Sequence, residues 1–318
     1  DSDPKDNLKI TTTGLTRLSM KNIQNIPAFL GEVDVIKSIT LLPGVTTVGE
    51  GAAGFNVRGG SIDQNLVLID GMQLFNTSHV LGFFSIFHPD ATRDFSLYKG
   101  HMPAKYGGRI SSVLDVNSLQ GNKQKWGGTA GLGTFSTRLT VEGPVTEKLS
   151  VLAAGRITYS DLILGQVKNL DIQNSQADFR DVFVRADNYF NDRHHMMVSF
   201  LHSKDNFNFA GDFGFQWSNN GVNLHYDFQI SPLTRLDITA NFLRYESTLS
   251  DFTEGLESEL SNGMDKWHSR ANFKITPGKH DINTGAEVTL YDPPVERLQP
   301  LNEVSGIVPK AVNRSRGR

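Results

Sequence analysis

The chain has 318 residues, enough for about two domains, and 38% hydrophobic residues plus 30 glycines place it with globular rather than disordered proteins. Its 31 Lys and Arg against 34 Asp and Glu leave a formal net charge of -3, so no global basic field is available to hold nucleic acid. The absence of cysteine excludes disulfide frameworks, thiolate nucleophiles and Cys-ligated zinc.

No run of residues is long and apolar enough for a membrane-spanning helix, and the start at Asp1 has neither the basic nor the apolar part of a signal peptide. Three alternatives are left: a soluble protein, one whose signal has been removed, or one that enters a membrane as β-strands. The mean hydropathy of -0.30 does not separate them, because a transmembrane β-barrel alternates lipid-facing with lumen-facing residues. The periodicity of the sequence does.

The first 120 residues are predicted to form a small α+β unit. Pro27 stands at a position typical of a helix start, and residues 31–42 carry isoleucines at helical spacing until Pro43-Gly44 ends the helix. Two short strands, each ending at a glycine turn, are predicted over Asn65–Ile69 and Phe95–Tyr98.

From Gly127 onward, apolar and polar residues alternate. In the clearest run, Val222–Ile230, every even-numbered residue is apolar and every odd-numbered one is polar. The alternation resumes after the turn Ser231–Thr234, and a period of two on both sides of a short turn predicts a β-hairpin. About nine strands of this kind are predicted. The others include 135–141, 149–159, 182–186, 196–200, 236–242, 271–275 and 282–290.

These strands favour an outer-membrane β-barrel over a soluble β-sandwich. Charged residues recur on the polar face of strand after strand, and turns of about four residues alternate with links of about twenty. The long links are predicted over 161–178, 205–219 and 247–267. Aromatic residues stand at strand ends, as at the interfaces of a membrane barrel: Tyr159, Phe190, Tyr245 and Tyr291. The predicted lumen is polar, and the predicted lipid face is apolar.

Three ordered runs in the first half carry a family resemblance: IPAFLGEVDVIKSITLLPGV at 26–45, FNVRGGSIDQNLVLIDG at 55–71 and FSLYKGHMPAKYGGRISSVLDV at 95–116. They resemble the plug domain of TonB-dependent outer-membrane receptors, most of all the Bacteroidetes-type branch with SusC-like and siderophore-receptor-like proteins. The resemblance implies an α+β plug domain followed by an antiparallel transmembrane β-barrel of 22 strands, which is wide enough to need a plug. It divides the chain into a lead segment 1–22, a plug domain 23–120 and the N-terminal part of the barrel, 121–318.

The chain departs from this pattern at three points. Only about nine of the 22 strands are predicted, the end at 313–318 has no terminal aromatic strand, and no Ton-box-like segment stands before Leu8. We therefore expect a portion of a longer protein, or a partial barrel that something else completes.

Arg58 and Arg109 stand beside paired glycines, at positions that match the RGG and YGGR motifs of the family. The resemblance implies that these plug arginines pair with carboxylates on the inner barrel wall. The alternative is a pair of surface arginines beside glycine turns.

Two aromatic segments are predicted to contact ligand. One is the plug loop 75–88, with candidates Phe75, Asn76, His79, Phe83 and Phe84; the alternative is that its apolar residues form plug core. The other lies in the predicted external loop 205–219. Its candidates are Phe207, Phe209, Phe213 and Trp217, which either grip a ligand or partner or form a cluster within a folded loop.

Other chemistry lacks a signal. Gly49–Gly54 matches G-x-G-x-x-G, but a strand-like run follows it where a dinucleotide site needs a helix. The nine histidines show no metal-ligand spacing, so no metal and no cofactor are predicted. No nucleophile elbow or zinc-protease motif is present, and the chain is not expected to be an enzyme.

The predicted function is uptake of a scarce solute, a siderophore, vitamin, peptide or glycan, through a plugged barrel in the bacterial outer membrane. The resemblance implies TonB as a partner, acting through an upstream segment, along with outer-membrane lipids and, for SusC-like members, a SusD-like surface lipoprotein. The main alternative is a plug-bearing subunit of a larger outer-membrane secretion or motility assembly. A third, an extracellular carbohydrate-binding β-protein, requires that the strands do not span a membrane.

Overall fold

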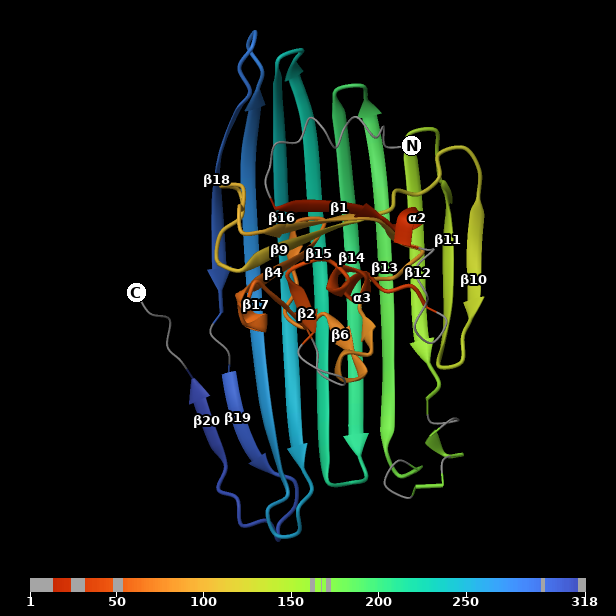
Figure 1. Cartoon of the computed structure of the whole chain (residues 1–318), viewed down its shortest axis with the longest axis vertical. Coiled ribbons are helices and arrows are strands. Elements are labelled where there is room, and N and C mark those ends of the chain that lie inside the picture. Colours follow the sequence, from red (N-terminus) through yellow and green to blue (C-terminus); the bar gives the residue numbers. More distant parts are fainter. Residues whose placement is uncertain are drawn as a thin grey trace.

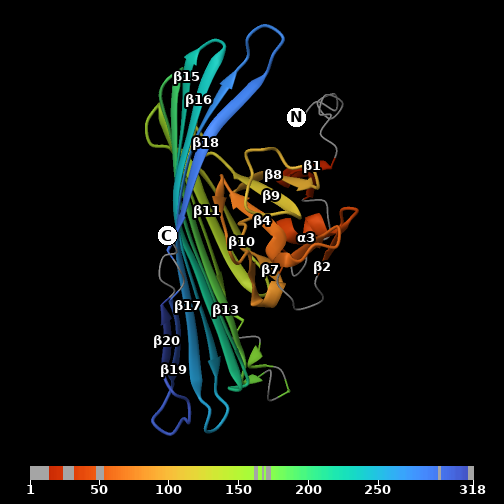
Figure 2. The same ribbon diagram turned by 90° about the vertical axis from the view of Figure 1, so that its left-hand side faces the viewer.

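The computed structural model describes residues 14–23, 32–47, 54–160, 164–166, 168–169, 173–292 and 295–313. A tall, curved sheet, called the wall below, carries a small mixed α/β domain, the plug, on one of its faces (Figures 1 and 2). We call the face that carries the plug the inner face, and the opposite one the outer face. Pro27 and Gly49–Ala53, which the sequence analysis singled out, lie outside the described residues.

The plug is built on a five-stranded sheet in the order β1-β8-β9-β4-β5. These strands are β1 Leu15–Ser19, β4 Asn65–Ile69, β5 Met72–Gln73, β8 Thr92–Lys99 and β9 Ser112–Ser118. Two small hairpins flank it, β2 Val45–Thr47 with β3 Phe55–Val57, and β6 Ser78–His79 with β7 Phe84–Ser85. The helices are α2 Met20–Ile23 and α3 Val35–Thr40, with 3-10 turns η1 Ile62–Gln64 and η2 Val80–Gly82.

The predicted plug elements form, with α3 inside the predicted helix 31–42. Asp34 caps α3 because its Oδ1 accepts the backbone N–H of Lys37 at 2.9 Å, and the helix ends before Pro43. The strand predicted at Asn65–Ile69 is β4, and the one at Phe95–Tyr98 lies within β8.

The wall has eleven antiparallel strands, β10 to β20, paired largely in chain order; β17 pairs with both β18 and β19. They are β10 Gly127–Leu132, β11 Ser136–Pro144, β12 Leu149–Thr158, β13 Gln176–Asn191, β14 His194–Phe209, β15 Phe213–Ser231, β16 Thr234–Asp251, β17 Ser258–Ile275, β18 Ile282–Tyr291, β19 Val295–Pro300 and β20 Lys310–Asn313. The predicted alternating strands are confirmed, and β19 and β20 are additional.

The predicted long links at 205–219 and 247–267 are wrong. β14 and β15 stay paired up to Phe209 opposite Phe213, which leaves a three-residue turn, and β16 and β17 stay paired up to Asp251 opposite Ser258. The backbone remains extended here, but the outer-face residues become polar, as at Lys204, Ser218 and Glu246. In β14 and β15 the apolar residues then lie on the inner face, as at Phe207 and Trp217, so the apolar set changes face at this point and the segment does not continue the pattern of the outer face.

The outer face carries a band of exposed apolar side chains. The register aligns them in rows across β14 to β18, from Phe200, Val222, Phe242, Trp267 and Leu290 to Phe228, Leu236 and Phe273, which are level with His194 of β14. Six residues separate the two rows on β14, or about 20 Å of strand, close to the apolar height of an outer-membrane barrel. Beyond Phe242 and Trp267 the next row holds Arg244 and Asp265, paired at 2.6 Å. None of the helices in the described residues is long and apolar enough to cross a membrane.

The hydrophobic core is shared between the plug and the inner face of the wall. Plug residues such as Ile39, Phe87 and Leu114 form one buried cluster with the wall residues Leu152 and Leu243. The two parts therefore pack as one unit in the described chain.

Gly221 of β15 lies directly against Met72 of the plug. A Cβ at this position would lie 2.5 Å from Met72 Sδ of the plug and 3.0 Å from Leu243 Cδ1. Because Gly221 has no side chain, the buried Met72 side chain can pack against the backbone of β15; we call this contact the Met72 seat.

We expect Gly221→Val to unseat Met72 and to lower the free energy of unfolding by about 1–3 kcal/mol through overpacking. Chemical unfolding in detergent measures this. Gly155→Val is the matched control, because the nearest atom to a Cβ there is a backbone oxygen at 3.8 Å. Equal stability of the two variants would contradict the seat.

Candidate functional site

Arg156 of β12 joins the wall to the plug. Its Nη2 lies 2.6 Å from Asp181 Oδ2 on the neighbouring β13, and its Nη1 lies 3.2 Å from Glu32 Oε1 in the plug. The same Nη2 donates to the backbone oxygen of Ser85 at 2.6 Å. All three charged groups are almost fully buried. A buried arginine is tolerated here because its donors are used by two carboxylates and a carbonyl.

Two further wall arginines reach plug carboxylates on either side of Arg156. Arg138 Nε donates to Asp90 Oδ2 at 2.8 Å. Arg185 lies 3.7 Å from Asp70 and donates to Ser118 Oγ at 2.8 Å, while Asp187 holds its other nitrogens. In these three contacts the wall supplies the cations and the plug the anions.

His79 is a fully buried polar contact between the plug and the wall. Its Nε2 lies 2.9 Å from Asp181 Oδ1 and its Nδ1 lies 3.2 Å from Asp205 Oδ2, both on the wall. The ring stacks between Phe179 and Trp217, with centroids 4.1 and 5.1 Å away. The side chain is 0% exposed. We call this arrangement the His79 clamp.

The charge of the clamp follows from its surroundings. Burial alone would lower the pKa of His79, but the carboxylates of Asp181 and Asp205 outweigh it and raise the pKa above its ordinary value of 6.5. A protonated ring donates from both nitrogens, which matches two carboxylates.

The clamp also holds a strained turn. Val80 and Leu81, next in the chain, have φ of 48° and 53°, a region that β-branched and bulky residues rarely adopt. The Val80 N–H donates to Asp205 Oδ2 at 2.8 Å, so the same carboxylate fixes the ring and the turn. Strain of this kind persists only where the surroundings enforce it.

The predicted ligand residues of the wall lie on its inner face, beyond the plug. Phe207, Phe209 and Phe213 meet at the tip of the β14–β15 hairpin, with ring centroids of Phe207 and Phe209 at 6.0 and 5.7 Å from that of Phe213. Phe213 is 41% exposed. Trp217, two rows deeper, is buried against His79.

The predicted ligand residues of the plug divide in the same way. His79 and Phe84 are buried in the interface with the wall, where they contact Phe179. Phe75 and Asn76 are half-buried, and Phe83 is exposed. In this state a ligand can therefore reach only Phe75, Asn76 and Phe83 among the plug candidates. Their role in binding stays a prediction.

Arg58 and Arg109 lie away from the three wall arginines. Arg58 is exposed, has a φ of 49°, and its guanidinium lies against Gly100 within the plug. Arg109 lines a cavity of about 720 Å³ beside Phe75. Within the described ranges neither arginine forms an ion pair, and their pairing with wall carboxylates stays a prediction.

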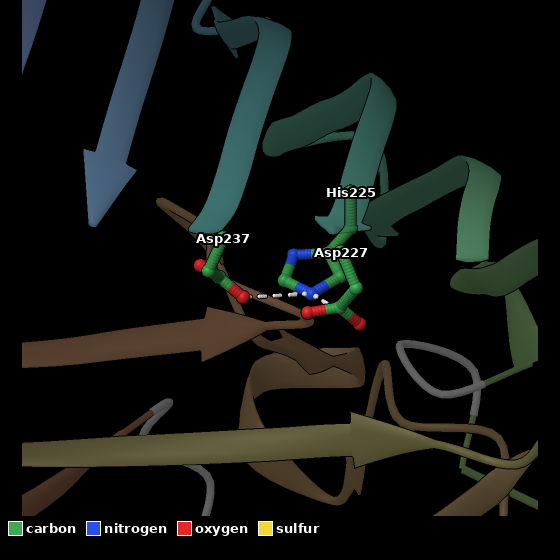
Figure 3. Close-up of side chains that lie close together, drawn as sticks. All are labelled: His225, Asp227 and Asp237. Atoms are coloured by element: carbon green, nitrogen blue, oxygen red, sulfur yellow. Dashed lines mark ion pairs between the residues drawn. The ribbon is translucent and has the colours of Figure 1, made fainter. Parts of the chain in front are cut away.

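A second cavity, of about 520 Å³, lies between the plug and the inner face of β14 to β17. From the plug it is lined by Asp70, Tyr106 and Asp115, and burial raises the pKa of Asp115, whose Oδ2 accepts the Tyr106 hydroxyl at 2.6 Å. From the wall, His225, Asp227 and Asp237 converge on one point of it (Figure 3).

These three residues form a set that sequence reasoning missed. His225 and Asp227 are two apart on β15, and the turn at 231–234 places Asp237 of β16 directly opposite Asp227. Their ligand atoms lie within 4.8 Å of one another. Spacing along one strand reveals only the first pair; the third residue requires the register of the hairpin.

The comparisons with known proteins agree with this architecture. Residues 10–113 match the TonB-dependent Receptor Plug Domain family. No curated protein sequence matches the chain at a significant level.

Several solved structures share the fold at low sequence identity. The ferric enterobactin receptor PfeA from Pseudomonas aeruginosa has a TM-score of 0.69 at 14% identity, over 92% of this chain and 50% of that one. The ferric citrate transporter FecA has a TM-score of 0.73 at 12% identity, over 96% and 51%. The copper transporter OprC has a TM-score of 0.71 at 11% identity, over 95% and 48%. The chain thus spans about half the length of these receptors.

The chain is a plug domain packed on the inner face of a membrane-barrel type of wall. Residues 10–113 match the plug domain of TonB-dependent receptors, and the chain shares its fold with the solved receptors and transporters named above.

We expect Arg156→Gln to lower the free energy of unfolding by about 3–5 kcal/mol, because it removes the nearest cation of buried Glu32 and one of the two cationic partners of buried Asp181. Chemical unfolding measures the loss. Arg244→Gln is the control: it removes the same charge from the same type of strand, but its pair with Asp265 is half exposed and contributes little. A loss no larger than that of the control would show that Arg156 does not hold the plug.

The His79 clamp should weaken as the pH rises. Because His79 titrates near 6.5 when unfolded and above that value when folded, its stabilisation is complete below about pH 6.5 and is lost as the pH passes the folded pKa. Hydrogen exchange of residues 78–85 should accelerate over this range beyond the intrinsic pH dependence. His79→Gln should abolish that excess, and an unchanged excess in the variant would assign it to another group.

Proposed function

We propose that this chain is part of a TonB-dependent transporter of the bacterial outer membrane that takes up a siderophore or another metal complex. The observation that carries the proposal is a plug seated on a polar inner wall by buried charged contacts, below an aromatic surface at one end of the strands. The coverage of about half of each related receptor makes the substrate and the partners part of the proposal.

The outer face supports a membrane location. Its apolar rows expose large side chains such as Val222 and Trp267, and the row beyond them turns to charged residues at Arg244 and Asp265. Aromatic side chains mark both edges of the band, Phe242 and Trp267 at one and Phe228 at the other. This is the arrangement expected of strands that face lipid.

The inner face supports a gate that can be moved. When the plug moves away, water solvates the charged groups that it uncovers, so opening a charged contact costs little free energy. Apolar side chains uncovered in the same way would stay exposed to water. The His79 clamp and the three wall arginines are contacts of the first kind. TonB, the partner implied by the family, would pull on the N-terminal side of the plug, where β1 lies at the edge of the plug sheet.

The hairpin tip supports capture of a ligand with flat or aromatic groups. Phe207, Phe209 and Phe213 present rings on the inner face, and Phe75 of the plug packs against Tyr245 with centroids 5.7 Å apart. Aryl groups of iron-chelating siderophores suit such a surface through ring stacking. PfeA is named as a receptor for ferric enterobactin, and FecA as a transporter of ferric citrate, so related folds accept different iron complexes. The proposal includes outer-membrane lipids around the wall; a SusD-like lipoprotein and a Bacteroidetes-type origin stay predictions.

The test is uptake of radiolabelled iron complexes by cells of a Gram-negative host that lacks its own siderophore receptors and expresses the full-length protein. We expect one complex of a panel of catecholate, hydroxamate and citrate chelates to accumulate, and to stop accumulating when TonB is deleted. Correct insertion without uptake of any complex would overturn the proposal for iron.

In the same assay, Phe213→Ala should weaken the binding of an aryl complex by about three- to tenfold, the equivalent of about 0.5–1.5 kcal/mol of ring stacking. Phe200→Ala is the matched control, because Phe200 is equally exposed but lies on the outer face. Equal affinities of the two variants would remove the hairpin tip from the binding surface.

A further inference from the structure

We propose that His225, Asp227 and Asp237 bind one divalent transition-metal ion on the inner face of the wall, opposite the plug. The three side chains come from the neighbouring strands β15 and β16 and point into the cavity of about 520 Å³ (Figure 3). The inference does not depend on the proposed uptake function, because it concerns only this cluster.

The two carboxylates require a cation. Asp227 and Asp237 face each other directly across the strand pair, and like charges in that position destabilise a sheet. Within the described residues, the ion-pair partner of Asp237 is His225, whose Nε2 lies 3.0 Å from Asp237 Oδ2 and 3.4 Å from Asp227 Oδ2. One imidazole therefore serves both carboxylates.

Arg235, a permanently charged neighbour of the cluster, contacts the oxygen of Asp227 that faces away from His225. Arg235 Nε donates to Oδ1 of Asp227 at 3.0 Å, which leaves Oδ2 of the same carboxylate facing His225 and, at 3.3 Å, His195 Nδ1. The arginine orients the carboxylate and leaves its second oxygen as a ligand.

The imidazole is oriented as a metal ligand would be. His225 Nδ1 lies 3.2 Å from Thr239 Oγ1 on β16, so a proton on Nδ1 can be donated to the hydroxyl while Nε2 keeps its lone pair for the metal. A hydrogen bond from the other ring nitrogen is the usual support of a metal-bound histidine. This contact is independent of the two carboxylates and points to the same position.

The spacing suits a small ion. With ligand bonds of about 2.1 Å at tetrahedral angles, two ligand atoms lie about 3.4 Å apart. The distances from His225 Nε2, 3.0 and 3.4 Å, need only a small adjustment. One imidazole and two carboxylates suit Zn²⁺ or Co²⁺, and water from the cavity can complete the coordination. Lys105 and Arg270 line the same cavity, so an anionic ligand on the ion is also compatible with it.

The test is metal binding by the full chain in detergent, stripped with chelator and dialysed against Zn²⁺ or Co²⁺. We expect one equivalent of Zn²⁺ per chain, and visible absorption of bound Co²⁺ stronger than that of the aqueous ion. His225→Gln and Asp237→Asn should each weaken Zn²⁺ binding at least about tenfold. Thr239→Val, which keeps all three ligands, should weaken it less.

Two controls separate the site from general binding. His202→Gln removes a histidine of the outer face that pairs with Asn220, and Asp281→Asn removes an exposed carboxylate near Lys274; both should bind Zn²⁺ as the parent does. Thermal unfolding of each variant shows whether it is folded. The Co²⁺ spectrum of the parent protein tests metal binding even if the ligand variants fail to fold. No bound equivalent, no enhanced spectrum, or equal binding by folded His225→Gln would leave an ion-pair cluster only and overturn the proposal.

Discussion

The structure depends on one constraint: the inner face of the wall carries charged side chains among its apolar ones, and where the plug covers them, every charge needs a partner. Asp181 shows how this is met. It accepts from Arg156 on the neighbouring strand, from Ser203 and from His79 of the plug. Removing the plug would leave Asp181 with two wall partners and an open side. The plug therefore completes the wall, and the wall in turn holds the His79 turn in a conformation that the turn would not adopt alone.

The alternation of the strands connects this interface to the outer face. Along β15, Asn223 is buried against the plug, where its side chain donates to the backbone oxygen of Asp70, while its neighbours Val222 and Leu224 point to the outer face. A shift of one residue in register would exchange the two sets and place polar groups outside and apolar ones against the plug charges. The same register that produces the apolar band therefore also aligns the partners of the plug. Membrane insertion and plug docking are two consequences of one strand pairing.

Charged contacts combined with an apolar core give this interface a mixed character. The buried apolar residues shared by plug and wall supply general adhesion. The charged groups contribute little net energy once their desolvation is counted, but they admit only the arrangement in which each finds its partner. An interface of this type is selective in the closed state and tolerates water when it opens. The cavity beside Asp70 and Asp115 shows that water-sized space already reaches between plug and wall in this state.

Much of the architecture could be predicted from the sequence because it depends on local patterns. Alternation located the strands from Gly127 onward, and the ordered plug motifs identified the first domain. The strand ends could not be predicted in the same way: beyond the apolar band the outer face of β14 to β17 turns polar and the apolar residues of β14 and β15 lie on the inner face, so the pattern of the preceding strand does not continue. Of the predicted aromatic residues, Phe207, Phe209 and Phe213 lie together at the hairpin tip, and burial divides the wider set, since Trp217 and His79 pack against each other and Phe213 stays exposed.

The charged partners required the tertiary structure. Arg156 and Glu32 are 124 positions apart and His79 is 102 positions from Asp181, and no spacing rule connects them. The His225 cluster depends on a cross-strand pairing that only the register defines. By itself, the sequence determined the plug, the strands and the two chemical faces of the wall, because local alternation encodes them. The tertiary structure decided which charges meet and which aromatics remain open, because those contacts depend on how the plug seats against the wall.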